Sequence, residues 1–387
     1  MNRPETFHRK AAWRFVVAMG VVSLFADMTY EGARSIIGAY LYHLGAGAVL
    51  AGLIGGGAEC LGYAVRWLSG RGADATNRHW LFLYSGYALN LLAVPFLALT
   101  GSLGSAAALI TAERLGKGVR SPPRDALLAR AGEQLGHGSA FGLHQFLDQL
   151  GALSGPLIVA ALVLSSGYKA GFAILAAPAV AALVTLVAAQ RLQIRPLARS
   201  RHLERLPRSF WLWIVFVMLS TAGFAHFTLV AFDLAAVGFG PAFIPVLFAI
   251  AMASEGLTAL LLGRLSDRRG FLLLAGFPLC GLVGTAFLFL GSAWVPWVGA
   301  VVWGAGLGIQ GAVVRAQVAR SVGEGRRGEA FGLLDTMTGV AWLAGSVLLG
   351  ALYTVSPEAL TALSALLEVA ALGWLLFYVR RKVQSPA

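Results

Sequence analysis

The sequence carries little charge. Only 12% of its 387 residues are Asp, Glu, Lys or Arg and 58% are hydrophobic, whereas a soluble domain holds about 25% charged residues. Apolar runs recur along the whole chain, and roughly a dozen reach the ~20 residues that a helix needs to cross a hydrocarbon layer. This composition excludes a soluble globular protein and predicts an all-α integral membrane protein.

Cysteine is scarce as well. Cys60 and Cys280 are the only two, and they lie in apolar segments far apart in the sequence. A disulfide framework needs more cysteines, so we interpret both as small packing residues.

Several catalytic signatures are missing. The sequence has no Walker phosphate loop, no H-E-x-x-H zinc motif and no G-x-S-x-G elbow. We therefore expect no enzymatic activity, no cofactor and no ATP as energy source. A membrane-embedded enzyme built on His137, His144 and Asp148, or a receptor that does not transport, stays a remote alternative.

Acidic residues are outnumbered, 18 against 30 basic ones, which gives a net charge of +12. Such an excess would suit a nucleic-acid-binding protein, but the cations cluster at alternate loops, and the loops between them carry one cation, Lys169. This asymmetry follows the positive-inside rule. We therefore expect no nucleic-acid partner, a multi-pass protein of the bacterial inner (plasma) membrane, and both termini in the cytoplasm. The basic clusters span residues 3–14, 66–78, 117–130, 191–208, 264–269, 315–327 and 380–382.

The chain repeats itself. "GRGAD" at 70–74 matches "GRLSD" at 263–267, 193 residues later, and "AFGLHQFLDQLGALSG" at 140–155 matches "AFGLLDTMTGVAWLAG" at 330–345, 190 residues later. The sequence therefore predicts two related six-helix bundles, 1–190 and 210–387, joined by an arginine-rich cytoplasmic linker at 191–209.

The apolar runs predict six spans in each half. The 48 glycines fit this reading, because small residues let helix backbones approach closely in lipid. The expected spans are 13–36, 46–68, 80–100, 104–128, 138–165, 170–190, 210–235, 241–263, 271–291, 294–319, 329–352 and 358–379.

A loop signature follows the second span of each half. Gly70, Asp74 and Arg78 match the pattern G-x-x-x-D-(R/K)-x-G-(R/K), although Ala75 and Asn77 depart from it. The second copy is fuller and contains Gly263, Asp267 and Arg268. With the six-plus-six layout, these motifs resemble the major facilitator superfamily over the whole chain. The resemblance implies a gating role for this loop, which clamps the cytoplasmic side of the outward-facing state.

Spans four and five carry weaker signatures. Arg114 and Gly118 resemble an R-x-x-Q-G motif that has Lys117 at the glutamine position, and the tandem prolines at 122–123 predict a break or kink. Gly151, Gly155 and Pro156 resemble the G-x-x-x-G-P core of drug/proton antiporters, without its trailing glycines. This resemblance favours export over uptake.

The stretch "GKGVRSPPRDALLA" followed by "FGLHQFLDQLGALSGP" also resembles a bacterial branch that includes nickel-resistance exporters. The histidine-rich tail of those proteins is missing, because this chain ends in "RRKVQSPA".

Charged residues within the predicted spans are the candidate substrate and proton sites, because an unpaired charge at membrane depth costs several kcal/mol. The candidates are Asp27, Glu31, Arg34, Glu59, Glu113, Arg114, His144, Asp148, Glu255 and Asp335.

Asp27, Glu31 and Arg34 are spaced i, i+4, i+7 and share one helical face, which would line the central cavity in a major facilitator protein. Arg34 can neutralise Glu31, which leaves Asp27 as the freer carboxylate; static pairs that lock the bundle are the alternative. His144 and Asp148 are one turn apart and could form a proton relay or half of a divalent-metal site.

These observations together predict a secondary active transporter. The leading hypothesis is a proton-coupled exporter of a small solute, an antiporter that works by alternating access and uses the proton gradient instead of a cofactor. Efflux of a divalent metal ion (Ni, Co or Fe) is the alternative. The expected partners are the substrate and the lipid bilayer, and we expect a monomer.

Overall fold

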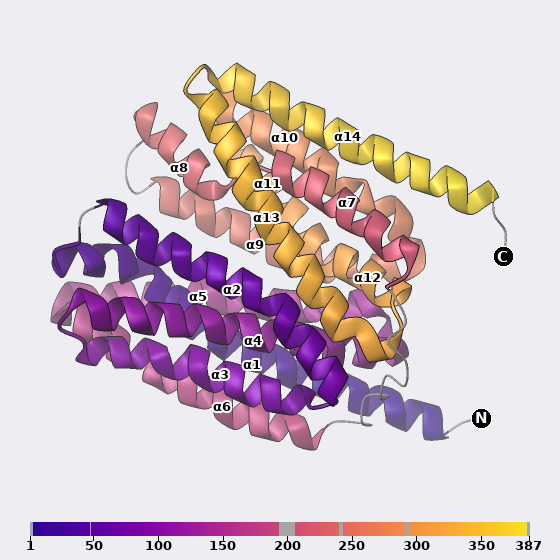
Figure 1. Ribbon diagram of the computed structural model, residues 1–387, viewed down its shortest axis with the longest axis horizontal. Coiled ribbons are helices and arrows are strands. Elements are labelled where there is room, and N and C mark those ends of the chain that lie inside the picture. The colour runs from indigo at the N-terminus through magenta and orange to yellow at the C-terminus, as the bar shows by residue number, and fades with distance from the viewer. Residues whose placement is uncertain (1–2, 47, 193–205, 240–242, 291–293, 385–387) are drawn as a thin grey trace.

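The computed structural model describes residues 3–46, 48–192, 206–239, 243–290 and 294–384, and within these ranges the regular structure is helical (Figure 1). Most of the predicted linker, 191–209, lies outside the described residues. The α-helices are α1 (Arg3–His43), α2 (Ala48–Thr76), α3 (His79–Phe96), α4 (Leu103–Leu135), α5 (His137–Ala173), α6 (Ala176–Arg191), α7 (Arg208–Gly223), α8 (Phe227–Ala236), α9 (Phe243–Leu274), α10 (Gly276–Leu290), α11 (Val295–Gly308), α12 (Arg315–Ser321), α13 (Arg327–Tyr353) and α14 (Pro357–Gln384). Short helices η1 (Leu97–Leu99), η2 (Ile309–Val314) and η3 (Glu324–Arg326) complete the chain.

These elements form the twelve spans that the sequence predicts. The seventh combines α7 and α8, and the tenth runs through α11, the π-helix η2 and α12. Ten helices among the described residues are long and apolar enough to cross a membrane. Several helices extend beyond the predicted spans, as α1 does by starting at Arg3 instead of residue 13.

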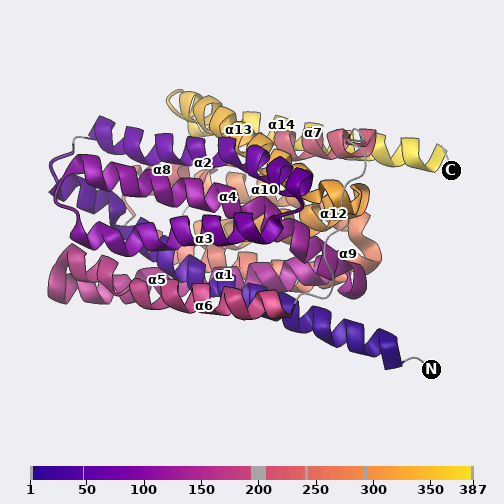
Figure 2. The same ribbon diagram turned by 60° about the horizontal axis from the view of Figure 1, so that its bottom comes forward.

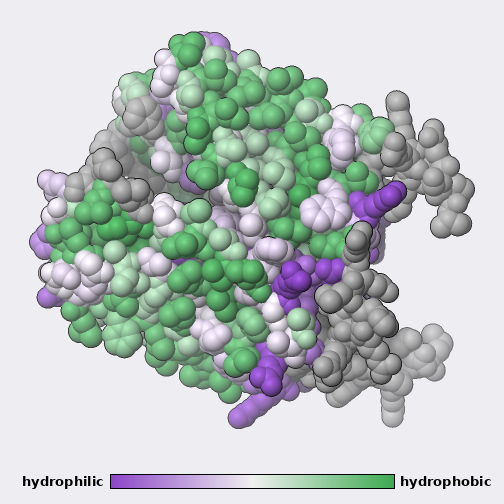
Figure 3. Space-filling model, viewed as in Figure 1, coloured by the Kyte–Doolittle hydropathy of each residue, from purple (hydrophilic) through white to green (hydrophobic). Residues whose placement is uncertain are grey.

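The helices lie side by side, with α1–α6 on one side of the molecule and α7–α14 on the other (Figures 1 and 2). The beginning of α1 and the end of α14 lie at the same end of the bundle. Hydrophilic side chains gather there, whereas the flanks are hydrophobic (Figure 3). We call this end, with Arg71, Arg78, Arg130, Arg320 and Arg326, the basic end. The apolar flanks match a lipid-facing surface.

Of the predicted break or kink at the tandem prolines, the break does not occur, because α4 continues through Pro122 and Pro123. A proline at 122 removes the amide that would bond to the carbonyl of Gly118. The hydroxyl of Ser69, on α2, donates to that carbonyl over 3.1 Å instead. A neighbouring helix thus satisfies the freed backbone group, which is how membrane helices tolerate proline.

Gly167 separates the fifth span from the sixth. Its φ of +77° lies in the left-handed region, which glycine adopts without steric cost. The helix following Gly167 leads into α6, so spans five and six are joined by a single sharp bend.

Glycines form the two seams between the halves. On α5, a Cβ at Gly138 would lie 2.0 Å from the carbonyl oxygen of Gly263 on α9. On α2, a Cβ at Gly70 would lie 2.0 Å from the carbonyl oxygen of Gly328 on α13. Gly263 is the repeat counterpart of Gly70, so both halves contribute the same packing device. Such close backbone approach holds α5 against α9 and α2 against α13.

The antiport-like glycines of α5 pack inside the first half. A Cβ at Gly151 would lie 2.1 Å from the carbonyl oxygen of Leu24, and one at Gly155 would lie 2.3 Å from that of Met28. Both contacts are with the backbone of α1. Gly151 and Gly155 therefore set the spacing between α1 and α5.

We predict that Gly151→Ala destabilises the protein. The added methyl group must push the α1 backbone away, and overpacking of this kind costs about 1–3 kcal/mol. Thermal unfolding of the purified protein in detergent measures the effect.

Gly104→Ala is the matched control, because its Cβ meets no atom within 4 Å. Replacing a helical glycine by alanine without a clash should leave stability unchanged or raise it slightly. Equal melting temperatures for the two variants would contradict close packing at Gly151.

Candidate functional site

The charged stripe of α1 has a buried and an exposed part. Asp27 is 3% exposed, whereas the side chain of Glu31 is 23% exposed and that of Arg34 is 47% exposed. Nη1 of Arg34 lies 3.4 Å from Oε1 of Glu31, and Nζ of Lys117 on α4 lies 3.7 Å from the same oxygen. Asp27, Glu31 and Arg34 lie within a membrane-span candidate. A half-exposed guanidinium at that depth requires water beside it, so this face of α1 borders a hydrated space.

Helices α2 and α4 bring further charges next to this stripe. Nε of Arg114 on α4 lies 3.0 Å from Oε2 of Glu59 on α2 and 3.3 Å from Oε2 of Glu113. The amide of Asn90 on α3 donates to Oε1 of Glu113 over 2.8 Å. Glu113 and Arg114 are buried, whereas Glu59 is 31% exposed. Glu113 therefore braces α3 against α4, and Glu59 stays on the exposed face.

Two cations lie against the ring of Tyr30 on α1. Nζ of Lys117 is 3.9 Å from the ring centroid and Cζ of Arg120 is 5.4 Å from it. Arg120 also lies 4.4 Å from the ring centroid of Tyr87 and is fully buried. Cation–π contacts gain strength in such desolvated places. They anchor the middle of α4 to α1 and α3.

Asp27 and Asp148 form a carboxyl pair between α1 and α5. Their charges act on each other, and the hydroxyl of Ser23 donates to Oδ1 of Asp148. Oδ1 of Asp27 is buried and has no partner among the described residues. Two adjacent buried carboxyl groups repel each other when both are ionised, which favours a proton on one of them. This pair is therefore a place where a proton can reside.

His144 lies one turn from Asp148 on α5. The side chain is 3% exposed, and its Nε2 is buried without a partner in the described part of the chain. Arg124 and Arg120 both act on it electrostatically. Across the described residues, no group of three or more His, Cys, Asp or Glu side chains could hold a metal ion. His144 and Asp148 would thus offer a metal two ligands at most, next to two positive charges.

The second half faces the charged stripe with aromatic and neutral groups. His226, between α7 and α8, packs its ring at 88° to that of Trp342 on α13, with 5.1 Å between centroids. The charges of Arg34 and Glu59 act on His226. The exposed face is therefore asymmetric, with ionic groups on the first half and an aromatic pair on the second.

The two motif aspartates cap helices of the opposite half at the basic end. Asp74 on α2 accepts a hydrogen bond from the backbone N–H of Glu329 on α13 over 2.7 Å. Asp267 on α9 accepts bonds from the N–H groups of Gly138 and Ser139 on α5 over 2.8 and 2.9 Å. The beginning of a helix has unpaired amides and a partial positive charge, so each carboxylate ties its own half to the other.

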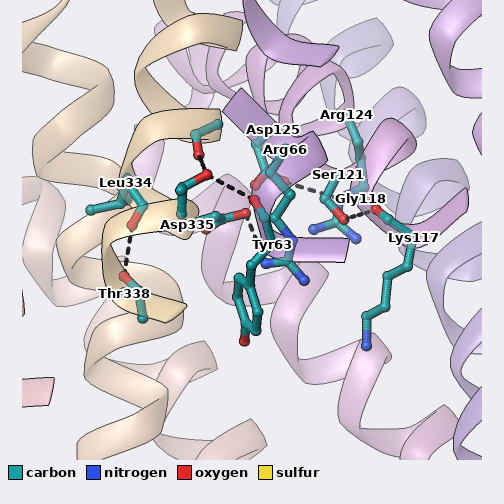
Figure 4. A network of polar contacts seen from close by, with 12 residues as sticks. Tyr63, Arg66, Lys117, Gly118, Ser121, Arg124, Asp125, Leu334, Asp335 and Thr338 are labelled. Atoms are coloured by element: carbon teal, nitrogen blue, oxygen red, sulfur yellow. Dashed lines mark hydrogen bonds and ion pairs between the residues drawn. The ribbon is translucent and has the colours of Figure 1, made fainter. Parts of the chain in front are cut away.

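A chain of alternating charges crosses the same region. Nη1 of Arg66 on α2 lies 3.2 Å from Oδ2 of Asp335 on α13, and Nη2 of Arg315 on α12 lies 2.7 Å from Oδ1 of Asp335. Arg315 also pairs with Asp125 on α4, and Nε of Arg124 lies 2.9 Å from Oδ1 of Asp125. Figure 4 shows Arg66 and Asp335 meeting between the halves, with Asp125 and Arg124 beyond them. We call these five residues the charge chain.

Further ion pairs seal the rim of the basic end. Nη1 of Arg327 on α13 lies 2.7 Å from Oε1 of Glu133 on α4, and Nη1 of Arg130 on α4 lies 2.5 Å from Oε1 of Glu324 in η3. With the glycine seams and the capped helices, these pairs close the basic end.

The structure also places residues that the sequence pattern did not single out. Arg120, Arg124, Asp125 and Arg315 lie on α4 and α12, within the predicted spans 104–128 and 294–319. The basic clusters that contain them were assigned to loops, and they overlap these spans because both helices continue into the basic end. The signal that could have identified Asp125 is a carboxylate inside a basic cluster.

Arg78 and Arg268, the predicted gating residues that carry a positive charge, take no part in the ion pairs described above. Arg78 precedes α3 and Arg268 lies near the end of α9, and both side chains are exposed.

Glu255 lies on α9 and faces α5, where Oε1 accepts a hydrogen bond from Nε2 of Gln145 over 2.9 Å.

Comparison with known proteins agrees with this geometry. The family model for the Major Facilitator Superfamily matches residues 19–346 and 234–387. The chain belongs to the major facilitator superfamily. It is 37% identical to an uncharacterized protein of Mycobacterium tuberculosis over 97% of this chain and 95% of that one. It is 26% identical to an uncharacterized transporter of the same superfamily from Methanocaldococcus jannaschii, over 94% of both chains.

Solved structures of the superfamily share the fold. The human organic anion transporter MFSD10 matches with a TM-score of 0.75 and 16% identity, over 97% of this chain and 100% of that one. A bacterial homologue of the iron transporter ferroportin, in an outward-facing state, matches with a TM-score of 0.73 and 15% identity, over 95% and 99%. The major facilitator protein described here is therefore a multi-pass membrane transporter and not an enzyme.

We predict that Arg315→Gln opens the basic end. Removing one partner from a buried ion pair costs about 3–5 kcal/mol, and Arg315 joins Asp125 of the first half to Asp335 of the second. Spin labels at Thr76→Cys and Leu265→Cys, in a background with Cys60→Ser and Cys280→Ser, report the distance between the ends of α2 and α9. The population with the longer distance should rise at least tenfold.

Arg191→Gln is the control for this experiment. Arg191 is an exposed arginine at the end of α6, so its replacement changes the net charge equally without touching the charge chain. An unchanged distance distribution in Arg315→Gln would show that the charge chain does not hold the basic end closed.

Proposed function

We propose that this protein is a proton-coupled secondary transporter that exports a small organic solute across the bacterial inner membrane by alternating access. The positive-inside rule supports assigning the basic end, and with it both termini, to the cytoplasm. On this assignment the closed basic end corresponds to an outward-facing state, with the hydrated face open to the outside.

The carboxyl pair of Asp27 and Asp148 carries the proposal. Both groups lie in membrane-span candidates, both are buried, and their charges act on each other. Two adjacent carboxylates repel each other when both are ionised, whereas nearby cations favour ionisation. Lys117 and Arg120 act on Asp27 from α4. A small change in the distance between α1 and α4 therefore changes how tightly the pair holds its proton.

The exposed face next to this pair suits a charged organic solute. Arg34 has one long contact, 3.4 Å from Glu31, so most of its five donors are free to bind a ligand. His226 and Trp342 supply ring surfaces across the space, which suit an organic body better than a bare ion. Proton loss and substrate binding are linked because Glu31 and Lys117 connect Arg34 to Asp27 along the same face.

The described side chains favour an organic solute over a metal ion. Nickel, cobalt and iron need several imidazole, thiolate or carboxylate ligands, and the pair His144 and Asp148 lies near Arg120 and Arg124. The iron transporter homologue and the organic anion transporter among the similar structures share the fold with this chain. The choice of substrate therefore rests on the side chains of the site.

Export is the direction that the G-x-x-x-G-P resemblance supports. In an antiporter, the inward flow of protons drives the solute outward, so the two must compete for the site. Alternating access then requires that the basic end open so that the proton can leave to the cytoplasm and the solute can enter the site, when the rocking of the two halves separates α5 from α9 and α2 from α13. We propose that a single chain performs this cycle.

We predict that a substrate gradient drives proton flux and that Asp27→Asn and Asp148→Asn each abolish it. An amide keeps the shape of the carboxyl group but cannot exchange a proton. Proteoliposomes that enclose a pH-sensitive dye measure the flux, with a panel of organic cations, organic anions, Ni²⁺, Co²⁺ and Fe²⁺ added in turn.

Glu358→Gln is the control variant, because Glu358 is exposed at the beginning of α14. Its flux should equal that of the unsubstituted protein. Proton flux with a divalent metal and with no organic compound would contradict the proposed substrate class. Flux that persists in both aspartate variants would contradict the proton site.

We also predict that Arg34→Gln weakens substrate binding and leaves the proton site intact. The apparent KM should rise about tenfold or more, since a hydrogen bond to a charged group contributes about 1.5–3 kcal/mol. Arg34→Lys should restore part of the affinity. Concentration dependence of the flux measures this, and an unchanged KM would exclude Arg34 from the substrate site.

A further inference from the structure

Glu255 is a carboxyl group on the seam between the two halves. It lies on α9, is 7% exposed and points toward α5 of the opposite half. Nε2 of Gln145 donates to Oε1 of Glu255 over 2.9 Å, and the side chain of Gln149 acts on the same carboxyl group. Gln145 and Gln149 are one helical turn apart, so two amides of α5 lie next to a carboxyl group of α9.

The charges around Glu255 do not neutralise it. Asp148 on α5 and Glu31 on α1 are the ionised groups that act on it most strongly, and both are acidic. The neighbouring helices α11 and η2 contain no ionisable residue. The two cations of α12 are paired with other carboxylates, Arg315 with Asp125 and Asp335 and Arg320 with Asp267. A buried carboxylate in these surroundings would be an uncompensated charge.

Two other groups close to the seam are already occupied. Asp233 on α8 is hydrogen-bonded to Tyr353 of α13, and His144 on α5 lies between Asp148 and Arg124. The ionisable side chain on α10 is that of Cys280, and the charged group next to it is Glu368. Neutralisation of Glu255 therefore has to come from a proton.

Gln149 provides an independent indication. Its Oε1 is buried and finds no donor among the described residues. An O–H on Glu255 would supply that donor once the amide is turned over, and the two orientations of an amide fit the same volume. Because an amide both donates and accepts, Gln145 and Gln149 can hydrogen-bond to a protonated carboxyl group as well as to an ionised one.

The seam also connects Glu255 to the charge chain. A Cβ at Gly308 of α11 would lie 2.4 Å from the carbonyl oxygen of Glu255, and one at Gly311 of η2 would lie 3.0 Å from Cδ of Gln145. Single π-helical turns such as η2 occur often at functional sites. Arg315 follows Gly311 by about one helical turn, so η2 lies between the Glu255 contact and the residue that joins Asp125 and Asp335.

We propose that Glu255 binds a second proton, which it holds while the basic end is closed and releases when the halves separate. Opening draws α9 away from Gln145 and Gln149 and exposes Glu255 to water, where the ionised form is stable. Because the closed state binds this proton and the open state does not, the closed population falls as pH rises. The inference rests on the proposed transport function and adds a proton that is tied to conformation.

The test measures conformation without a substrate. The protein with spin labels at Thr76→Cys and Leu265→Cys is placed in lipid nanodiscs, and distances are measured by double electron–electron resonance from acidic to alkaline pH. The unsubstituted protein should gain a longer distance as pH rises. Glu255→Gln, which mimics the protonated form, should keep the short distance at every pH, and Glu255→Asp should retain the response.

If Glu255→Gln folds poorly, a second variant and a second measurement test the same inference. Gln145→Leu removes a donor that stabilises the carboxylate, so the pH of opening should shift upward, whereas Gln134→Leu, exposed at the end of α4, should cause no shift. Infrared difference spectra should show the carbonyl band of a protonated carboxyl group that disappears on opening and is missing in Glu255→Gln.

A pH response in Glu255→Gln equal to that of the unsubstituted protein would overturn the inference, as would a closed population that does not depend on pH. These outcomes are distinct from failure of the proposed function. A chain that shows the pH response of Glu255 but moves no protons with any solute would refute the transport proposal alone.

Discussion

A charge within the hydrocarbon of a membrane must be paired, hydrated or neutralised by a proton, because leaving it bare costs several kcal/mol. This major facilitator protein uses all three solutions, each at a different place. Arg315 and its carboxylate partners are paired at the basic end, and Arg34 is half exposed on the face of α1, where we propose that water reaches it. The proton that we propose between Asp27 and Asp148 is the third solution. The position of each charge thus indicates whether it closes the protein, faces the substrate or carries a proton.

At the seams, close glycine packing and interactions between charged groups stabilise the contact between the halves in different ways. Gly138 against Gly263, and Gly70 against Gly328, allow backbones to touch, and this contact is the same at any pH. The caps by Asp74 and Asp267 and the charge chain add interactions that water can replace when the halves separate. Ion pairs in a low dielectric gain much from closure and lose little once hydrated. A seam built in this way is stable when dry and is easily opened once water enters.

Much of the candidate site follows from the sequence, and the remainder does not. The spacing of Asp27, Glu31 and Arg34 predicts one helical face, and the structure has Glu31 and Arg34 together on it. Helical periodicity cannot reveal that Asp27 meets Asp148 of another helix, because that contact depends on how Gly151 lets α5 approach α1. It also cannot reveal that Asp125 and Arg315 form a pair, since they lie 190 residues apart in clusters that resemble solvated loops.

The sequence by itself determined the class of protein, the twelve spans, the internal repeat and the family, because hydropathy, glycine content and loop motifs are properties of short segments. Tertiary structure decided which charges are exposed, which are paired across the halves and which end of the bundle is closed. It also placed Glu255 between Gln145 and Gln149. These features depend on distances between helices that are far apart in the chain, and the electrostatic energy of a buried group is set by its neighbours in space.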